Sequence, residues 1–198
     1  MGAVKLTKNE LKRQKDGLKR FKRYLPTLQL KKQQLQMMIR QVEHEEAQKL
    51  AEREEVRKIL DGWIEVFGEP VDVENLLKVE SLVTEAGNIA GIDIPIFKEI
   101  RFQDINYDLF SYPLWVDAAL EKLKEMLSFD AELVVLEEQR KRLEQELRIT
   151  TQRVNLFEKV KIPEAQENIR MIRIYLGDQQ TAAVVRGKIS KNKIEAGQ

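Results

Sequence analysis

The sequence has no cysteine, a single histidine and no long run of apolar residues. The lack of cysteine excludes disulfides and thiolate metal sites, and it favours a reducing, cytoplasmic setting. No apolar run approaches the roughly 20 residues that a helix needs to cross a bilayer, and the N-terminus is too rich in lysine for the core of a signal peptide. We therefore expect no direct membrane insertion, so that any attachment to a membrane is peripheral.

Aromatic residues are also scarce, at 7% of the 198 residues, whereas charged residues make up 34%. This balance favours long solvated helices with a narrow apolar seam over a broad globular core. Lys and Arg total 34 against 33 Asp and Glu, which gives no reason to expect nucleic acid or anionic lipid on the whole surface. The local balance differs: residues 1–40 hold twelve Lys/Arg and two acids, whereas residues 43–69 hold nine acids and four bases.

The N-terminal part of the chain has the pattern of a coiled-coil helix. Thr7 followed by Glu10 forms a capping box, in which each side chain satisfies a free backbone N–H at a helix start. Apolar residues then recur in steps of three and four, with polar exceptions at Gln14 and Lys32. The predicted seam of this helix consists of Leu11, Leu18, Phe21, Leu25, Leu28, Leu35, Ile39 and Val42.

The same pattern continues less strictly through Ile64 and Phe67 and stops at Gly68-Glu69-Pro70. We therefore predict an N-terminal helix within residues 1–67. Pro26 lies inside it and removes one backbone donor, but the seam keeps its phase across the proline. A bend is expected there rather than a break.

A second long helix is predicted within residues 113–198. It starts near Pro113, a residue suited to a first helical turn, and it bends at Pro163. Gly177 marks its expected end, after which the tail is polar and basic. Its predicted seam consists of Leu133, Leu136, Leu143, Leu147, Val154, Phe157, Ile169, Ile172 and Leu176.

Residues 68–112 form a different kind of segment, for which a β-hairpin between about residues 79 and 102 is predicted. Glycines at positions 87 and 91 supply turn signals, and Pro95 limits its strand to an edge. The candidate hairpin residues are Ile89, Ile92, Ile94, Ile96 and Phe97. The expected fold is thus mainly α, a long antiparallel two-helix coiled coil with a small β-hairpin insert, forming one elongated unit.

Antiparallel pairing of the two helices would bring both chain ends to one basic tip. The candidate residues of this tip are Lys12, Arg13, Lys19, Arg20, Arg186 and Lys188. Residues for catalysis, metal or cofactor are not expected. His44 stands among glutamates, but neighbouring residues on a helix point in different directions and there is no second histidine. Arg186-Gly187-Lys188 lacks the spacing of a phosphate-binding loop.

Three stretches of the sequence resemble, in order, the D subunits of V-type ATP synthases: KLTKNELKRQKDGLKRFKRYLPTLQLKKQQLQ, NIAGIDIPIF and RVNLFEKVKIPEAQENIRMIRIYL. The resemblance covers nearly the whole chain. It implies a non-catalytic, central-stalk rotor shaft that transmits torque between a catalytic head of A and B subunits and an ion-translocating membrane ring. It also implies that the F subunit of the V-type ATPase binds alongside, and that a central-stalk subunit links the shaft to the proteolipid ring.

Two other functions are compatible with the sequence. A generic coiled-coil adaptor would have the same seam, and partner choice would distinguish it. A nucleic-acid-binding protein could use the basic N-terminal helix, but aromatics are few there and Phe21 lies on the seam. We therefore expect no nucleic acid among the partners.

Overall fold

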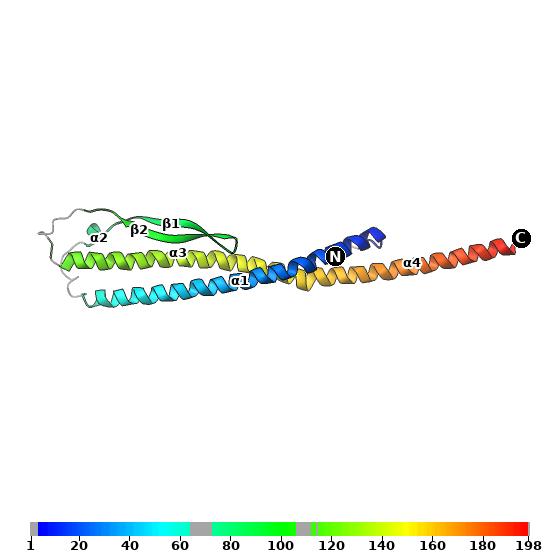
Figure 1. The fold of residues 1–198 in the computed structure, drawn as a ribbon, viewed down its shortest axis with the longest axis horizontal. Coiled ribbons are helices and arrows are strands. Elements are labelled where there is room, and N and C mark those ends of the chain that lie inside the picture. The colour runs from blue at the N-terminus through cyan, green and yellow to red at the C-terminus, as the bar shows by residue number, and fades with distance from the viewer. Residues whose placement is uncertain (1–3, 64–72, 106–111, 114, 198) are drawn as a thin grey trace. The chain divides into compact units, whose positions relative to one another are not determined.

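The computed structural model describes residues 4–63, 73–105, 112–113 and 115–197. The described chain is mainly helical, with a two-stranded antiparallel hairpin between its long helices, which confirms the predicted fold class (Figure 1). The elements in order are α1 (Lys8–Asp61), α2 (Val73–Leu76), β1 (Val79–Ile89), β2 (Ile92–Phe102), α3 (Trp115–Asn155), the π-helical turn η2 (Leu156–Lys161) and α4 (Ile162–Ala196).

The chain divides into two compact units. Unit 1 combines Met1–Lys32 with Ile149–Gln198, and unit 2 is the continuous stretch Gln33–Arg148. Helices α1 and α3 contribute to both units. The segments predicted along the sequence, 1–67, 68–112 and 113–198, follow the order of elements, whereas each unit joins parts of the first and last long helices.

Helix α1 begins as its sequence predicts and passes Pro26 without interruption. The Glu10 N–H donates to Thr7 Oγ1 at 3.2 Å, which is half of a capping box. The Glu10 carboxylate accepts a hydrogen bond from Gln14 Nε2 at 2.8 Å, so the polar residue in the seam has a partner. The helix ends at Asp61, and a turn follows at Gly62 and Trp63. The predicted end at Phe67 lies outside the described residues.

Unit 2 is held together by a buried cluster between α1 and α3. Its core residues are Leu35, Ile39, Val42, Leu136 and Leu143, of which Leu35 and Leu143 are fully buried. The polar residues that interrupt the α1 seam beyond this cluster pair across to α3. Glu46 meets Arg140, Lys49 meets Glu132 and Arg53 meets Asp130. As the residue number on α1 rises, the residue number of its ion-pair partner on α3 falls. The two helices of unit 2 therefore run antiparallel.

The hairpin of unit 2 pairs Val79 with Phe102 at one end and Ile89 with Ile92 at the other. Its turn is Ala90-Gly91, with φ of 53° and 80°, as in a type I′ turn. Ile89 and Ile92 pack against the α1–α3 cluster. Ile94 is buried, whereas Ile96 lies exposed over Gly87. Phe97 is half-buried.

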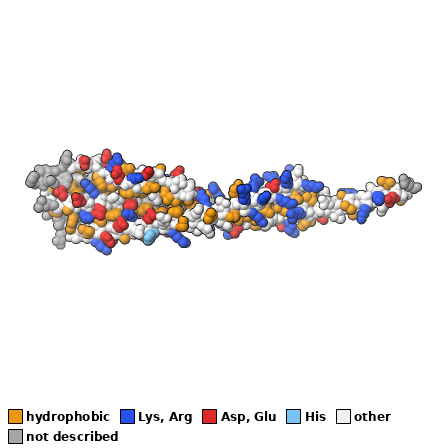
Figure 2. Space-filling view, viewed as in Figure 1, with side chains coloured by type: hydrophobic (Ala, Val, Ile, Leu, Met, Phe, Trp, Pro, Cys, Tyr) orange, Lys and Arg blue, Asp and Glu red, His pale blue; other side chains and the backbone are white. Residues whose placement is uncertain are grey.

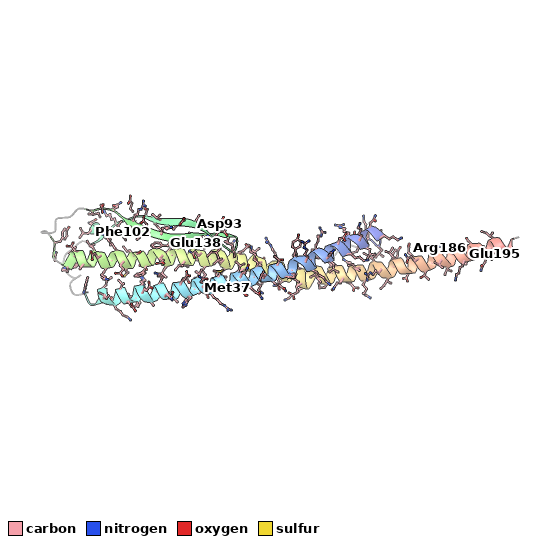
Figure 3. The ribbon with its side chains drawn as sticks, viewed as in Figure 1. Met37, Asp93, Phe102, Glu138, Arg186 and Glu195 are labelled. Carbon is pink, nitrogen blue, oxygen red and sulfur yellow. The ribbon has the colours of Figure 1, made fainter. Side chains whose placement is uncertain are left out.

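Helix α3 has a second buried face, which carries the hairpin. Gln139 is buried and donates from Nε2 to the Pro95 carbonyl at 2.6 Å. Arg142 donates from Nη1 to the Asp93 carbonyl at 3.1 Å while its Nε is held by Glu138 at 2.8 Å. Figure 3 shows Asp93 and Glu138 close together at this point. The spacing of apolar residues in steps of three and four predicted the face of α3 that packs against α1. It did not predict the face that packs against the hairpin.

Between α3 and α4 the helix widens into the π turn η2. The Ile162 N–H donates to the carbonyl of Phe157, five residues earlier. The buried or half-buried positions Leu147, Thr150, Val154, Phe157 and Lys161 follow one another in steps of three and four, and buried Ala165 comes after a second step of four. The π turn absorbs this extra residue, so that the buried positions before and after it face the same way. It ends two residues before Pro163, the position at which the sequence predicts a bend.

The predicted end of the C-terminal helix at Gly177 is wrong, because α4 continues to Ala196. A glycine within a helix costs only about 1 kcal/mol relative to alanine. The following residues include Ala182 and Ala183, which favour helix, and Thr181 donates to the Gly177 carbonyl at 3.1 Å. A lone glycine without a following proline is therefore a weak stop signal.

Candidate partner-binding surface

The two units carry opposite formal charges. The sequence stretches of unit 1 contain 20 Lys/Arg and 7 Asp/Glu, a difference of +13. Those of unit 2 contain 14 Lys/Arg and 26 Asp/Glu, a difference of −12. Figure 2 shows Lys and Arg side chains gathered over the paired parts of α1 and α4. Since self-repulsion of like charges opposes folding, such a surface is typical of one that meets a partner of the other sign.

The helix pair of unit 1 positions these basic side chains. The rings of Phe21 and Phe157 lie 5.3 Å apart and join α1 to the π turn. Along α4, buried Ile169 and Ile172 continue the seam. The described side chains of residues 4–32 are all half-buried or exposed, so α1 covers α4 with a thin apolar stripe and turns its lysines and arginines outward.

One groove of about 500 Å³ opens between α1 and α4 on this surface. Leu18 from α1 and Ile169 from α4 supply its apolar lining, and Gln166 adds an amide. The remaining lining residues are all cations, namely Lys15, Lys19, Lys22 and Arg173. A second groove of about 280 Å³ lies between the same elements, and its lining includes Arg13, Arg20, Lys161 and Glu164.

The cations of unit 1 differ in whether an acid neutralises them. Arg170 Nη2 lies 2.7 Å from Glu167 Oε1, and this hydrogen bond lowers the pKa of Glu167 below its usual value of 4.5. Lys161 pairs with Glu164 at 3.1 Å, in the second groove. Among the described residues, by contrast, the four cations of the larger groove have no ion pair.

The predicted basic-tip residues are all exposed. Lys12, Arg13, Lys19 and Arg20 line a shallow hollow on α1 with Asn9 and Asp16. Arg186 and Lys188 lie on the exposed stretch of α4 beyond Gly177 (Figure 3 labels Arg186). The basic residue of α4 that joins α1 lysines in the larger groove is instead Arg173. The spacing of Lys15, Lys19 and Lys22 on one helix face was the available signal.

The predicted seam residues all lie buried or half-buried. The buried ones are Leu35, Ile39, Val42, Leu136, Leu143, Val154, Ile169 and Ile172. The half-buried ones are Leu11, Leu18, Phe21, Leu25, Leu28, Leu133, Leu147, Phe157 and Leu176.

In the part of the chain that the structure describes, no three His, Cys, Asp or Glu side chains come together in a way that could hold a metal ion, and His44 is exposed. No described helix is both long and apolar enough to cross a bilayer.

Known proteins are similar to this chain over nearly its whole length. A family model for the D subunit of ATP synthase matches residues 10–192, which include parts of both units. The V-type ATP synthase D subunit of Borreliella burgdorferi is 53% identical over 194 residues, covering 98% of this chain and 96% of that protein. The chain belongs to the ATP synthase D subunit family. The resemblance seen in the three sequence stretches is confirmed.

Other members of the D subunit family are more distant. The V-type ATP synthase D subunit of Chlamydia abortus is 35% identical over 195 residues, covering 97% of this chain and 94% of that protein. That of Chlamydia muridarum is 33% identical over 195 residues, covering 97% and 96%. These matches extend along both long helices and the hairpin, so the relationship to V-type D subunits applies to the whole described architecture.

Proposed function

We propose that this chain is the non-catalytic central-stalk rotor subunit of a V-type ATP synthase/ATPase. It transmits torque between the catalytic head, where A and B subunits hydrolyse or make ATP, and the ion-translocating membrane ring. The observation that carries the proposal is the strongly basic helix pair of unit 1, built on an intramolecular seam in a member of the D subunit family. The F subunit and a central-stalk subunit that links to the proteolipid ring are the other partners.

The interior of each unit supports a mechanical role. A paired helix resists twisting because its side chains interdigitate with those of the partner turn by turn. In unit 2 the cross-helix pairs of Arg140 with Glu46 and of Lys49 with Glu132 add fixed points beyond the apolar cluster. Partly buried ion pairs of this kind favour one register between two helices. A single register is what a torque-carrying element requires.

The exterior of unit 1 supports contact with a surrounding head. Between residues 5 and 30 more than half of the exposed side chains of α1 and the segment before it are charged, so neighbouring surfaces meet this stretch through electrostatics rather than deep apolar burial. An asymmetric rotor inside the head stabilises different conformations of successive catalytic sites by contacting them differently. Mounted as a peripheral part of the complex, on the cytoplasmic side, the chain contributes no catalytic residue.

The test is reconstitution with purified partners. We expect the full chain to form a one-to-one complex with the F subunit, and that complex to bind a head of A and B subunits. Native mass spectrometry gives both stoichiometries, and ATP hydrolysis by the reconstituted complex gives function. A chain that binds neither the F subunit nor the head contradicts the proposal.

Exposed apolar side chains on α4 favour one second candidate, a generic coiled-coil adaptor. Val184, Val185 and Ile189 are each at least half exposed and could pair with a foreign helix. An adaptor would bind such a helix while ignoring the head of A and B subunits, so the same reconstitution separates the two functions.

A further inference from the structure

In unit 1 both paired helices have interrupted backbone hydrogen bonding, and the interruptions lie close to the same level. The rings of Phe21 and Phe157 lie 5.3 Å apart, which places these two residues opposite each other. Phe157 belongs to the π turn η2, and Pro26 lies in α1 one and a half turns from Phe21, or about 7.5 Å along the helix. Because Pro26 has no N–H, it cannot donate to the carbonyl of Lys22 as a helical residue normally does.

The π turn interrupts the C-terminal helix in a comparable way. The Ile162 N–H, which would donate to the Glu158 carbonyl in an α-helix, donates to the Phe157 carbonyl instead. The next residue, Pro163, would serve the Glu158 carbonyl in a longer π-helix, but it has no N–H. Neither of the two usual positions therefore supplies a donor to this carbonyl.

Side-chain packing is also thin at this level. None of the described side chains from Phe157 to Glu164 is buried, and the same holds for residues 4–32. Leu156 and Val160 are each 44% exposed. Thr150, one seam step further into α3, is 1% exposed, and no described group forms a hydrogen bond with its hydroxyl. A buried hydroxyl without a partner weakens the seam there.

We infer that this stretch of unit 1 is a built-in hinge, at which the paired helices bend and twist more readily than on either side. It comprises residues 21–26 of α1 and residues 150–163 of the C-terminal helix. A helix pair resists bending and twisting through its backbone hydrogen bonds and through interdigitated side chains, and both are reduced here. Local opening is easiest where buried contacts are few.

The neighbouring residues keep the hinge in one place. If the extra residue of η2 moved toward α4, a regular α-helical turn would drive the Pro163 ring against the carbonyl of Lys159. If it moved toward α3, Phe157 would rotate away from Phe21 and exposed Glu158 would turn toward the seam. Both movements cost free energy, so the flexible point stays beside Phe21.

The hinge itself does not depend on the proposed function, whereas its use does. A rotor in contact with an asymmetric head has to yield at one point without losing the register of its seam. Beyond the hinge the seam of α4 is closed again at Ile169 and Ile172, which are 7% and 0% exposed. Deformation is thereby confined to one short stretch.

The experiment measures the width of distance distributions across the hinge. The chain has no cysteine, so introduced cysteines carry spin labels only at chosen positions. Gln152→Cys/Gln166→Cys labels exposed sites on either side of η2, and Val134→Cys/Arg148→Cys labels exposed sites at the same sequence separation on continuous α3. In double electron–electron resonance of the full chain, we expect the first distribution to be about twice as broad as the second.

A further variant tests the cause of the width. Deletion of Lys159 together with Pro163→Ala restores regular α-helical hydrogen bonding and keeps the phase of the downstream seam. We expect it to narrow the distribution across the hinge to the width of the α3 pair. Circular dichroism checks that the variant is folded.

Hydrogen exchange in the unmodified chain gives a readout that needs no variant, and it decides if the deletion variant fails to fold. Amides of residues 158–164 should exchange at least about tenfold faster than those of residues 138–144 in α3. The same exchange measurement on the folded deletion variant should remove most of this difference.

Equal widths for the two labelled pairs overturn the inference, and so do equal exchange rates in the two stretches. A broad distribution that persists after regular hydrogen bonding is restored also overturns it, because the motion then arises elsewhere. None of these results affects the rotor function, which binding to the F subunit and the head tests. A chain that binds neither partner keeps its hinge and loses only the use assigned to it.

Discussion

Gln139 Nε2 lies 2.6 Å from the carbonyl oxygen of Pro95, so a buried side chain of α3 is tied to the backbone of β2. Removing the amide leaves a carbonyl without its donor, which typically costs about 1–3 kcal/mol. We expect Gln139→Ala to lower the free energy of unfolding by about this amount. Amide hydrogen exchange should also quicken around Asp93 to Phe97. The exposed Gln145 on the same helix is the control, and equal effects of Gln145→Ala would contradict the role of this hydrogen bond.

The hairpin turn contains a residue that is unsuited to its conformation. Ala90 has a φ of 53°, a region that costs a non-glycine residue about 1–2 kcal/mol and that Asn tolerates better. We expect Ala90→Asn, which creates an Asn-Gly turn, to raise the free energy of unfolding by about 0.5 kcal/mol or more in urea titrations. Ala86→Asn, also exposed in the hairpin, should not raise it.

The π turn predicts an asymmetric response to deletions. Because η2 holds one extra residue, deleting exposed Lys159 leaves a regular helix whose downstream seam still faces α1. Deleting exposed Gln152 from regular helix rotates every following side chain by about 100°. We expect thermal unfolding followed by circular dichroism to show a small shift for the first deletion and a large loss for the second. Similar losses from both would contradict this account of η2.

The sequence predicted those features that repeat along one helix or one hairpin. The 3–4 spacing identified the seam, and the turn signals with alternating isoleucines identified the strands. It could not reveal the second buried face of α3, because Gln139 is buried where it binds a hairpin whose docking side depends on tertiary packing. The sequence also could not show that Lys49 and Arg53 lie between the two helices. Their ion pairs depend on which acidic residues of α3 lie opposite them.

The sequence predicted that the candidate surface is positively charged, but not which residues line its groove. Twelve bases in the first forty residues indicated a basic helix, yet the groove also needs Arg173, whose place opposite Lys15 and Lys22 follows from the pairing of α4 with α1. The single residue added by the π turn shifts the seam of α4, so a strict heptad continued from Phe157 assigns the facing positions one residue too early.

Lys49 links stability to alkaline pH. Its hydrogen bond to Glu52 and the charge of Glu132 raise its pKa above the usual 10.5, so folding favours the charged amine. The resulting stability is fully present below the unfolded pKa and is lost as pH rises through the folded pKa. We expect Lys49→Met to lower the free energy of unfolding by about 0.5–1 kcal/mol at about pH 8. That difference should shrink above pH 10.5. Lys58→Met, which removes an exposed lysine from the same helix, is the matched control variant.

Truncation after Leu176 tests the exposed part of α4. The described residues beyond it are all exposed, so their removal leaves the seam of unit 1 in place. We expect the truncated chain to keep its thermal unfolding midpoint and its binding to the F subunit, but to dissociate faster from the head of A and B subunits, as measured by surface plasmon resonance. Unchanged dissociation would contradict a head contact by this segment.

The opposite charges of the two units mean that the net charge of +1 describes neither of them. At physiological ionic strength, salt screens electrostatic interactions beyond about 8 Å. An approaching molecule therefore interacts with the charge of the nearest unit and not with the net charge of the chain. The same chain should adsorb to both cation- and anion-exchange resins at neutral pH. In assembly, a partner of either sign is drawn to one unit and repelled by the other, which selects the direction of docking before any side chain is in contact.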